Sequence, residues 1–249
     1  MRRKLLTLTA ATALLASTAL AGGLGQMTHD ERAAFGAEVR QYLLDNPQVL
    51  MEAMKVLQDQ QDQVATQQEQ TVLSENHDFL FNDPDSWVGG NPDGDITVIE
   101  FIDYRCGYCR KADEEVANLI KSDGNIRFVV KEFPILGDDS TASSRFAIAV
   151  RLLHGDDAYA AAHDALITLR GTPDPQTLSR MAEDMGLPAQ PVLDMMGSDR
   201  VTGIIAANHA IAQQLNISGT PTFIIDDVLL RGYLPEEDMK RIVAEARAG

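Results

Sequence analysis

The chain has 249 residues, of which 45% are hydrophobic, and it carries a formal net charge of −16 at pH 7. This length provides for one large domain, or for one domain with an extension, and the composition allows a substantial core. The acidic balance argues against nucleic acid as a partner, because binding to phosphates requires a basic surface.

The N-terminus has the layout of a secretory signal. Three basic residues at positions 2–4 precede an apolar stretch over residues 5–20, and Ala19-Leu20-Ala21 fits a small-residue cleavage site. We therefore predict a signal peptide over residues 1–21 and export of the mature protein to an oxidising compartment, where a disulfide can persist; the family resemblance described below implies that this compartment is the periplasm. An uncleaved membrane anchor is the alternative, although the apolar run is short for a span.

Residues 22–74 are predicted to form a helical extension. Thr28-His29-Asp30-Glu31 has the pattern of a capping box that opens a first helix. Asn46-Pro47 ends this helix and starts a second, with Asn46 as its N-cap and Pro47 at its first position. The apolar face of the first helix consists of Phe35, Val39, Tyr42 and Leu43.

The second helix of the extension carries a heptad seam, which is apolar at first and then contains glutamines. Its members are Leu50, Met54, Leu57, Gln61, Val64, Gln68 and Thr71. Two interpretations stay open, a solvated helical linker or an oligomerisation stalk that makes the protein a homo-oligomer. Turn-rich segments at 82–85 and 89–94 follow, and we place the domain boundary near residue 74.

Strand and helix patterns alternate through residues 75–249. We predict a helix directly after Cys106 and a last helix from 235 to about 248, with strands over 96–102, 126–133, 222–225 and 228–231. Glycines and prolines divide residues 141–215 into four or five helices. This order predicts an α/β class, and it resembles a thioredoxin-like fold with a helical insertion at about 138–215.

Both cysteines of the chain lie three positions apart where a strand ends and a helix begins. The first helical turn offers free N–H groups and the positive end of the helix dipole, which favour a thiolate at Cys106. Arg105 and Arg110 add positive charge nearby. Cys106 is therefore the candidate nucleophile, and Cys109, one turn further inside, is the candidate resolving thiol.

Two other interpretations of the cysteine pair are less favoured. Half of a zinc site would need two more ligands at suitable spacing, and the nearest histidines, His77 and His154, are distant in sequence. A purely structural disulfide across so short a loop would stabilise the fold little. We predict no metal and no cofactor.

A second motif, Ser218-Gly219-Thr220-Pro221-Thr222-Phe223, opens the late strand. Together with Cys-Gly-Tyr-Cys it resembles the DsbA-like thiol–disulfide oxidoreductases of the bacterial cell envelope, over residues 75–249. The resemblance implies that Pro221 is a cis-proline and that Thr220 offers backbone groups to an extended substrate segment. It also implies that Glu100 is a buried acid that relays the proton of Cys109. A glutamate on the rim of the sheet is the alternative for Glu100, and Lys131 is a possible ion-pair partner for it.

The dipeptide Gly107-Tyr108 between the cysteines helps to set redox poise. With Thr220 before the proline, it resembles the periplasmic disulfide isomerases, and the extension resembles proteins tied to suppression of copper sensitivity. The resemblance implies an isomerase or reductase that acts on disulfides or free thiols of exported proteins, recycled by a membrane redox partner. A disulfide-forming oxidase, a Cu(I)-binding periplasmic protein and a scaffold whose arm binds partners are the alternatives.

Overall fold

The computed structural model describes residues 27–248, so the predicted signal peptide over 1–21 lies outside the described residues. The chain divides into two compact units, one that ends at Gln63 and one that starts at Val64. We describe each by itself. Within residues 27–248, no helix has the length and apolar character needed to cross a bilayer.

The first unit contains α1 (His29–Asp45) and the larger part of α2 (Pro47–Glu75). The predicted capping box is present at the start of α1, where Thr28 Oγ1 accepts from the Glu31 N–H at 3.3 Å and the Glu31 carboxylate accepts from the Thr28 N–H at 2.8 Å. As predicted, Asn46 directly precedes α2 and Pro47 is its first residue. The side-chain amide of Asn46 donates to the Tyr42 carbonyl at 2.9 Å and so also caps the end of α1.

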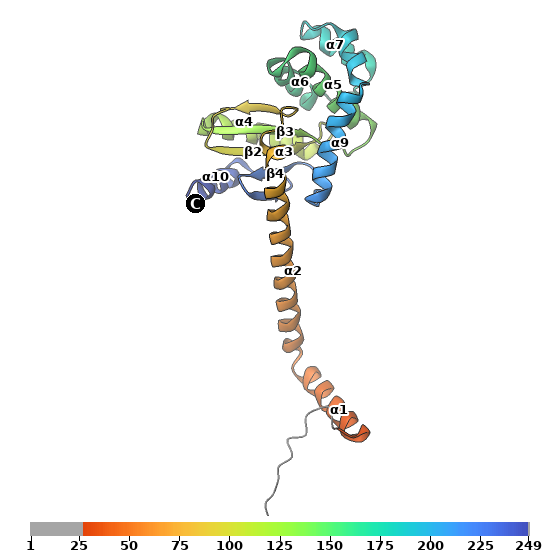
Figure 1. Cartoon of the computed structure of the whole chain (residues 1–249), viewed down its shortest axis with the longest axis vertical. Helices are drawn as coiled ribbons and strands as arrows, with labels where there is room; N and C mark the ends of the chain where they lie inside the picture. Colours follow the sequence, from red (N-terminus) through yellow and green to blue (C-terminus); the bar gives the residue numbers. More distant parts are fainter. Residues whose placement is uncertain (1–26, 249) are drawn as a thin grey trace, which may run out of the picture. The chain divides into compact units, whose positions relative to one another are not determined.

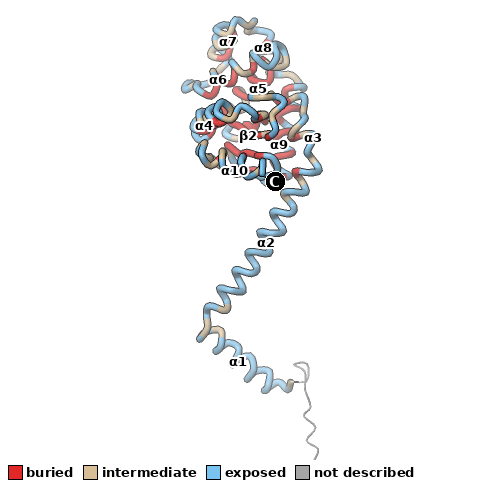
Figure 2. The backbone as a smooth tube through the Cα atoms, turned by 90° about the vertical axis from the view of Figure 1, so that its left-hand side faces the viewer, coloured by how far each residue is buried: buried red, intermediate tan, exposed pale blue. Residues whose placement is uncertain are grey.

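The apolar side chains of α1 and of the N-terminal part of α2 are exposed, and no residue of α1 is buried (Figure 2). The exposed residues include three of the predicted apolar face of α1, Phe35, Val39 and Tyr42. They also include the apolar seam positions of α2, Leu50, Met54, Leu57 and Val64. Exposed apolar side chains at heptad spacing are a surface that can pair with another helix.

The second unit is built on a five-stranded sheet with the order β1-β3-β2-β4-β5 (Figure 1). Its strands are β1 (Trp87–Gly90), β2 (Ile96–Ile102), β3 (Ile126–Glu132), β4 (Thr222–Ile225) and β5 (Val228–Arg231). β2 and β3 are parallel, whereas the other neighbouring pairs are antiparallel. The four predicted strands are confirmed. The edge strand β1 was not predicted, because its two glycines give it the appearance of a turn.

Helices surround this sheet, and five of them form the predicted insertion between β3 and β4 (Figure 1). The insertion comprises α5 (Asp138–His154), α6 (Asp156–Thr168), α7 (Pro175–Asp184), α8 (Ala189–Met196) and α9 (Asp199–Gln214). The remaining helices of this unit are α3 (His77–Phe81), α4 (Gly107–Asp123) and α10 (Glu236–Ala248). The mixed sheet with its helices is the expected thioredoxin-like α/β fold.

Alternation along the strands divides the core into two clusters. Val98 and Ile102 of β2 and Val130 of β3 join the cluster that contains both cysteines and most of the insertion. Ile99 and Phe101 of β2 belong to the other cluster, on the opposite face of the sheet. A residue's position in this alternation therefore decides whether its side chain lies on the side of the cysteines.

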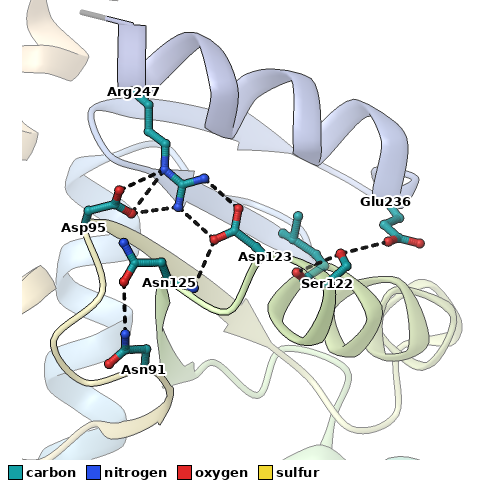
Figure 3. A network of polar contacts seen from close by, with 8 residues as sticks. Asn91, Asp95, Ser122, Asp123, Asn125, Glu236 and Arg247 are labelled. Atoms are coloured by element: carbon teal, nitrogen blue, oxygen red, sulfur yellow. Dashed lines mark hydrogen bonds and ion pairs between the residues drawn. The ribbon is translucent and has the colours of Figure 1, made fainter.

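Arg247, near the end of α10, ties three segments together (Figure 3). Its guanidinium contacts Asp95, just before β2, at 2.7 Å and Asp123, at the end of α4, at 2.6 Å. These two ion pairs hold α10 and the end of α4 beside the start of β2. The cysteine motif follows the other end of the same strand.

Candidate active site

Cys106 is the N-cap residue of α4, with extended φ and ψ of −73° and 122°. The helix predicted directly after Cys106 is confirmed, and Ala112, Val116 and Leu119 on one face of it are buried against the core. The same periodicity places Cys109 in the interior with 0% exposure, whereas Cys106 is 8% exposed. Both are free thiols. The sequence thus separates one thiol at the helix start from one inside the core.

The surroundings of the two thiols move their pKa values in opposite directions. A hydrogen bond from the Cys109 thiol, helped by the backbone N–H groups of Cys109 and Tyr108, lowers the pKa of Cys106 to about 5, against the effect of burial. Burial above all, and then the bond to Cys106, raises the pKa of Cys109 far above its usual range. At neutral pH, Cys106 is therefore a thiolate and Cys109 a neutral thiol, which are the states that a nucleophile and a resolving thiol require.

The second motif lies directly against this thiolate. The Thr220–Pro221 peptide bond is cis, and Cys106 Sγ lies 3.1 Å from the Thr220 carbonyl oxygen. A hollow of about 280 Å³ is lined by residues 218–222 with Arg231 and Gly232. The two sequence motifs therefore form one site with an open side.

Gly107 and Tyr108 lie on the outer side of the site. Tyr108 is 64% exposed, and a Cβ added at Gly107 would meet nothing within 4 Å. Among residues 27–248, the space beside Gly107 at the outer side of the cysteine pair is therefore open.

Glu100 is buried, with 2% exposure, on the face of the sheet that carries the cysteines. Its Oε1 has no hydrogen-bond partner among residues 27–248. Burial first, and then the negative charges of Asp113, Cys106 and Glu132, raise its pKa well above the usual range. The surroundings of Glu100 thus favour the neutral form of its carboxyl, and the alternative of a solvated glutamate on the rim is wrong.

The suggested ion pair between Lys131 and Glu100 is wrong. Glu100 is paired in register with Val130, and Lys131 with Phe101, so the two side chains project from opposite faces of the sheet. Lys131 instead contacts Asp83 at 2.8 Å and donates to the Phe79 carbonyl, on the far side from the cysteines.

Arg105 and Arg110 are less important for the Cys106 thiolate than their sequence positions suggest. Arg110 Nη2 donates to the Leu169 carbonyl at 2.7 Å, and Arg105 Nη1 donates to the Gly171 carbonyl at 2.9 Å. The thiolate is stabilised by Cys109 and backbone N–H groups, while the two arginines attach the loop after α6 to the start of α4.

A buried polar cluster beneath Cys106 was not recognised from the sequence. The Glu132 carboxylate accepts hydrogen bonds from Tyr104 at 2.9 Å and from Tyr159 at 2.6 Å. His163 lies 3.2 Å from the Tyr104 hydroxyl and 3.3 Å from Asp113 of α4. The only signal in the sequence was the glutamate that ends a buried strand. Its partners are Tyr104, which follows β2, and Tyr159 from the insertion.

Comparisons with known proteins agree with this geometry. The family model described as Thioredoxin matches residues 82–245, and the model described as Copper resistance protein ScsC N-terminal domain matches residues 31–63. Two curated relatives, Na(+)/H(+) antiporters NhaA of Salinispora tropica and Salinispora arenicola, are 30% identical over 58% and 67% of this chain. The chain spans only 22% and 26% of their length.

Solved structures of similar proteins cover the second unit or nearly the whole chain. A thioredoxin-like oxidoreductase from Silicibacter pomeroyi is 40% identical, with a TM-score of 0.66, over 70% of this chain and 99% of its own. A linker-deletion mutant of Proteus mirabilis ScsC is 22% identical, with a TM-score of 0.66, over 91% and 99%. The thiol-disulfide exchange protein alpha-DsbA2 from Wolbachia pipientis is 24% identical, with a TM-score of 0.66, over 73% and 97%.

The matched family model spans more than half of the chain and includes both cysteines and Pro221. The low-identity structures share the fold, and the Silicibacter protein combines that fold with substantial identity. The chain therefore belongs to the thioredoxin family, with a fold that it shares with solved structures of ScsC and alpha-DsbA2.

Proposed function

We propose that the protein is a disulfide isomerase or reductase of exported proteins, and that a membrane redox partner keeps its cysteine pair reduced in the periplasm. The observation that supports this most is the contrast between a Cys106 thiolate at the open side and a neutral, buried Cys109. An isomerase must attack substrate disulfides from its reduced form, and a thiolate at neutral pH is the state that does so.

The first step is attack of Cys106 Sγ on one sulfur of a substrate disulfide. The substrate S–S bond breaks, a mixed disulfide forms, and the other substrate sulfur leaves as a thiolate. In isomerisation, this thiolate or another substrate thiolate later displaces Cys106, so no net electrons are transferred. In reduction, Cys109 loses its proton and displaces the substrate sulfur, which leaves the Cys106–Cys109 disulfide and a reduced substrate.

Glu100 would hold the proton that Cys109 gives up. Its carboxyl is neutral while Cys106 is a thiolate, and the charge of Cys106 is one cause of its raised pKa. Formation of the mixed disulfide removes that charge and so favours ionisation of Glu100, whose proton goes to the substrate thiolate that has left. The carboxylate then accepts the Cys109 proton, and in the reverse direction the neutral acid returns it.

Thr220 and Pro221 would hold the substrate backbone. The Thr220 carbonyl lies beside Cys106 Sγ, and the hollow along residues 218–222 leaves the segment before β4 open to one side. An extended substrate that adds to this segment would place its disulfide next to the thiolate.

The helical extension would assemble protomers. The apolar seam positions Leu50, Met54, Leu57 and Val64 are all exposed, and burial of each contributes about 1.5–3 kcal/mol. Two or more catalytic units joined in this way raise the local concentration of thiol near a misfolded substrate.

The redox state of the cysteine pair in cells tests the direction of the reaction. Acid quenching followed by alkylation with a large maleimide should find Cys106 and Cys109 mostly reduced. Purified reduced protein should also recover the activity of a scrambled multi-disulfide substrate. A mostly oxidised pair, with no recovery, would support the disulfide-forming oxidase instead.

Copper binding is the second candidate, favoured by the match of residues 31–63 to a domain named for copper resistance. Two free thiols are soft ligands suited to Cu(I). Titration of the reduced protein with Cu(I) against a competing chelator, with the Cys106→Ser variant as control, decides whether such a site exists.

A further inference from the structure

We propose that a basic surface formed by Arg105, Arg110 and Arg170 selects substrate segments that carry carboxylates beside the cysteine under attack. This inference rests on the proposed function and names the substrate class of the same site. It starts from the position of Arg110, which lies one helical turn beyond the nucleophile, with its N–H bonded to the Cys106 carbonyl at 3.2 Å.

Hydrogen bonds hold the Arg105 and Arg110 side chains against the backbone on either side of Arg170, whose charge acts on Arg110. The Arg110 guanidinium donates to the carbonyls of Tyr104 at 3.0 Å and Leu169 at 2.7 Å. Arg105 donates to the carbonyls of Leu169 and Gly171, at 3.3 and 2.9 Å. These two carbonyls belong to the residues on either side of Arg170, which is exposed.

The positive charges of this basic surface are poorly neutralised. Within residues 27–248, neither Arg110 nor Arg170 has a carboxylate within 4.0 Å, and Arg105 has only Asp139 at 3.6 Å. By contrast, Arg247 of α10, which lies beside the C-terminal end of α4, contacts the carboxylates of Asp95 and Asp123. Burial, together with the charges of Arg105 and Arg170, lowers the pKa of Arg110, while Asp103 and Cys106 act in the opposite direction.

The Arg110 guanidinium also has N–H groups that its two hydrogen bonds leave free. A guanidinium has five N–H groups, and the Arg110 hydrogen bonds to Tyr104 and Leu169 engage only two of them. A carboxylate that approaches along the substrate can therefore be bound without breaking the contacts that hold the loop. In a chain with a net charge of −16, such a surface beside the nucleophile distinguishes acidic substrate segments from basic ones.

The test compares three activated peptide disulfides with identical cores and acidic, neutral or basic residues around the cysteine. Each carries a chromogenic leaving thiol, and stopped-flow absorbance with reduced full-length protein gives the second-order rate constants. At low salt, we expect the acidic peptide to react about 5–10-fold faster than the basic one. The ratio should fall toward one as the ionic strength approaches 1 M, because the Debye length shrinks to about 3 Å.

Substitutions of Arg170 assign this preference to the surface. Arg170→Lys should keep most of the acidic-to-basic ratio, Arg170→Gln should reduce it, and Arg170→Glu should reduce it further. Lys121→Gln is the matched control, because it removes one charge from the same helix as Cys106, about 22 Å further along. It should leave the ratio unchanged. Because the readout is a ratio, a general change in Cys106 reactivity cancels.

The outcomes separate this inference from the proposed function. If the unmutated protein reacts with the neutral peptide but shows equal acidic and basic rates, the inference is wrong and the oxidoreductase function stands. If Arg170→Gln slows all three peptides by the same factor, Arg170 acts on the thiolate and not on selection, which also overturns it. Failure to recover a scrambled substrate would count against the isomerase function alone.

Discussion

The sulfur of Cys106 lies 3.1 Å from the carbonyl oxygen of Thr220, although 114 positions separate the two residues in the chain. Antiparallel pairing of β2 with β4 brings them together, since Phe101, near the end of β2, is opposite Thr222, at the start of β4. The nucleophile and the backbone that would hold its substrate are thus fixed by one strand pair, and the five helices of the insertion lie between them in sequence.

The division of roles between the cysteines leads to opposite effects of their substitution. Cys106→Ser should abolish disulfide reduction, whereas Cys109→Ser should keep the nucleophile and accumulate mixed disulfides, because the resolving thiol is absent. Non-reducing gels of cell extracts, with and without dithiothreitol, measure the trapped complexes. Substrates trapped through Cys109 in the Cys106→Ser variant would reverse the assignment.

The low pKa of Cys106 should be visible in alkylation kinetics. With its pKa lowered to about 5 by the bond from Cys109, the rate of reaction with iodoacetamide should rise through pH 5 and be nearly constant from pH 6.5 to 8. Cys109→Ala removes that bond and should move the midpoint upward. A midpoint near 8.5, the usual value of a free cysteine, in the unmutated protein would contradict the assignment.

The same pKa shift links stability to pH. Between about pH 5 and the unfolded thiol's pKa near 8.5, the unfolded state binds more protons at Cys106 than the native state. This site therefore makes the reduced protein more stable as pH rises through that window, and the contribution is lost again as pH falls toward 5. Urea titrations at several pH values should show this trend, and Cys106→Ser should remove its share.

Glu100→Gln should slow resolution of the mixed disulfide, because the replaced side chain cannot exchange a proton with Cys109. Stability at pH 7 should not fall. Because the pKa of Glu100 is raised on folding, its contribution to stability is fully present only below its unfolded pKa and is lost as pH rises through its folded pKa. Rapid-quench kinetics and thermal unfolding separate the two effects. Exchange rates equal to those of the unmutated protein at every pH from 5 to 8 would exclude the relay.

The buried contact between Lys131 and Asp83 should matter for stability and not for catalysis. The Lys131 side chain is 0% exposed, and Asp83→Asn would leave its ammonium without a counter-charge. We expect a loss of about 3–5 kcal/mol in the free energy of unfolding. Lys131→Met combined with Asp83→Leu should recover part of it. Denaturant titration checks this, and unchanged stability of Asp83→Asn would show that the pair is not needed.

The apolar seam of α2 should control assembly. The double substitution Leu50→Asp and Leu57→Asp should convert a dimer or trimer into a monomer, because carboxylates cannot be buried at the seam without a large cost. The monomer should keep dithiol reductase activity and lose isomerase activity. Val56→Asp with Gln63→Asp, one position off the seam, is the matched control.

Light scattering of the mature protein measures its assembly directly. A monomeric unmutated protein would remove the claim of an oligomer. Isomerase activity that persists in the Leu50 and Leu57 double variant would separate assembly from function.

Local patterns in the sequence were enough to identify the chemistry and most of the elements. A strand of β-branched residues followed by Cys-Gly-Tyr-Cys and an amphipathic helix specifies a thiol at a helix start, since hydrogen bonding at a helix terminus is a local property. Thr28 and Glu31 likewise identify the start of α1 by contacts within one turn. These features depend on neighbours a few positions away, so they can be recognised in the sequence.

Only the tertiary structure decided which distant side chains meet. Whether Lys131 reaches Glu100 depends on the register of β3 against β2, and a shift of one residue exchanges the faces of the sheet. The cluster of Glu132 with Tyr104, Tyr159 and His163 requires the insertion to pack onto α4 and β3. Likewise, Arg105 and Arg110 point to the loop at Leu169 and not to the thiolate. Such contacts form because packing brings remote segments together, and no local pattern encodes them.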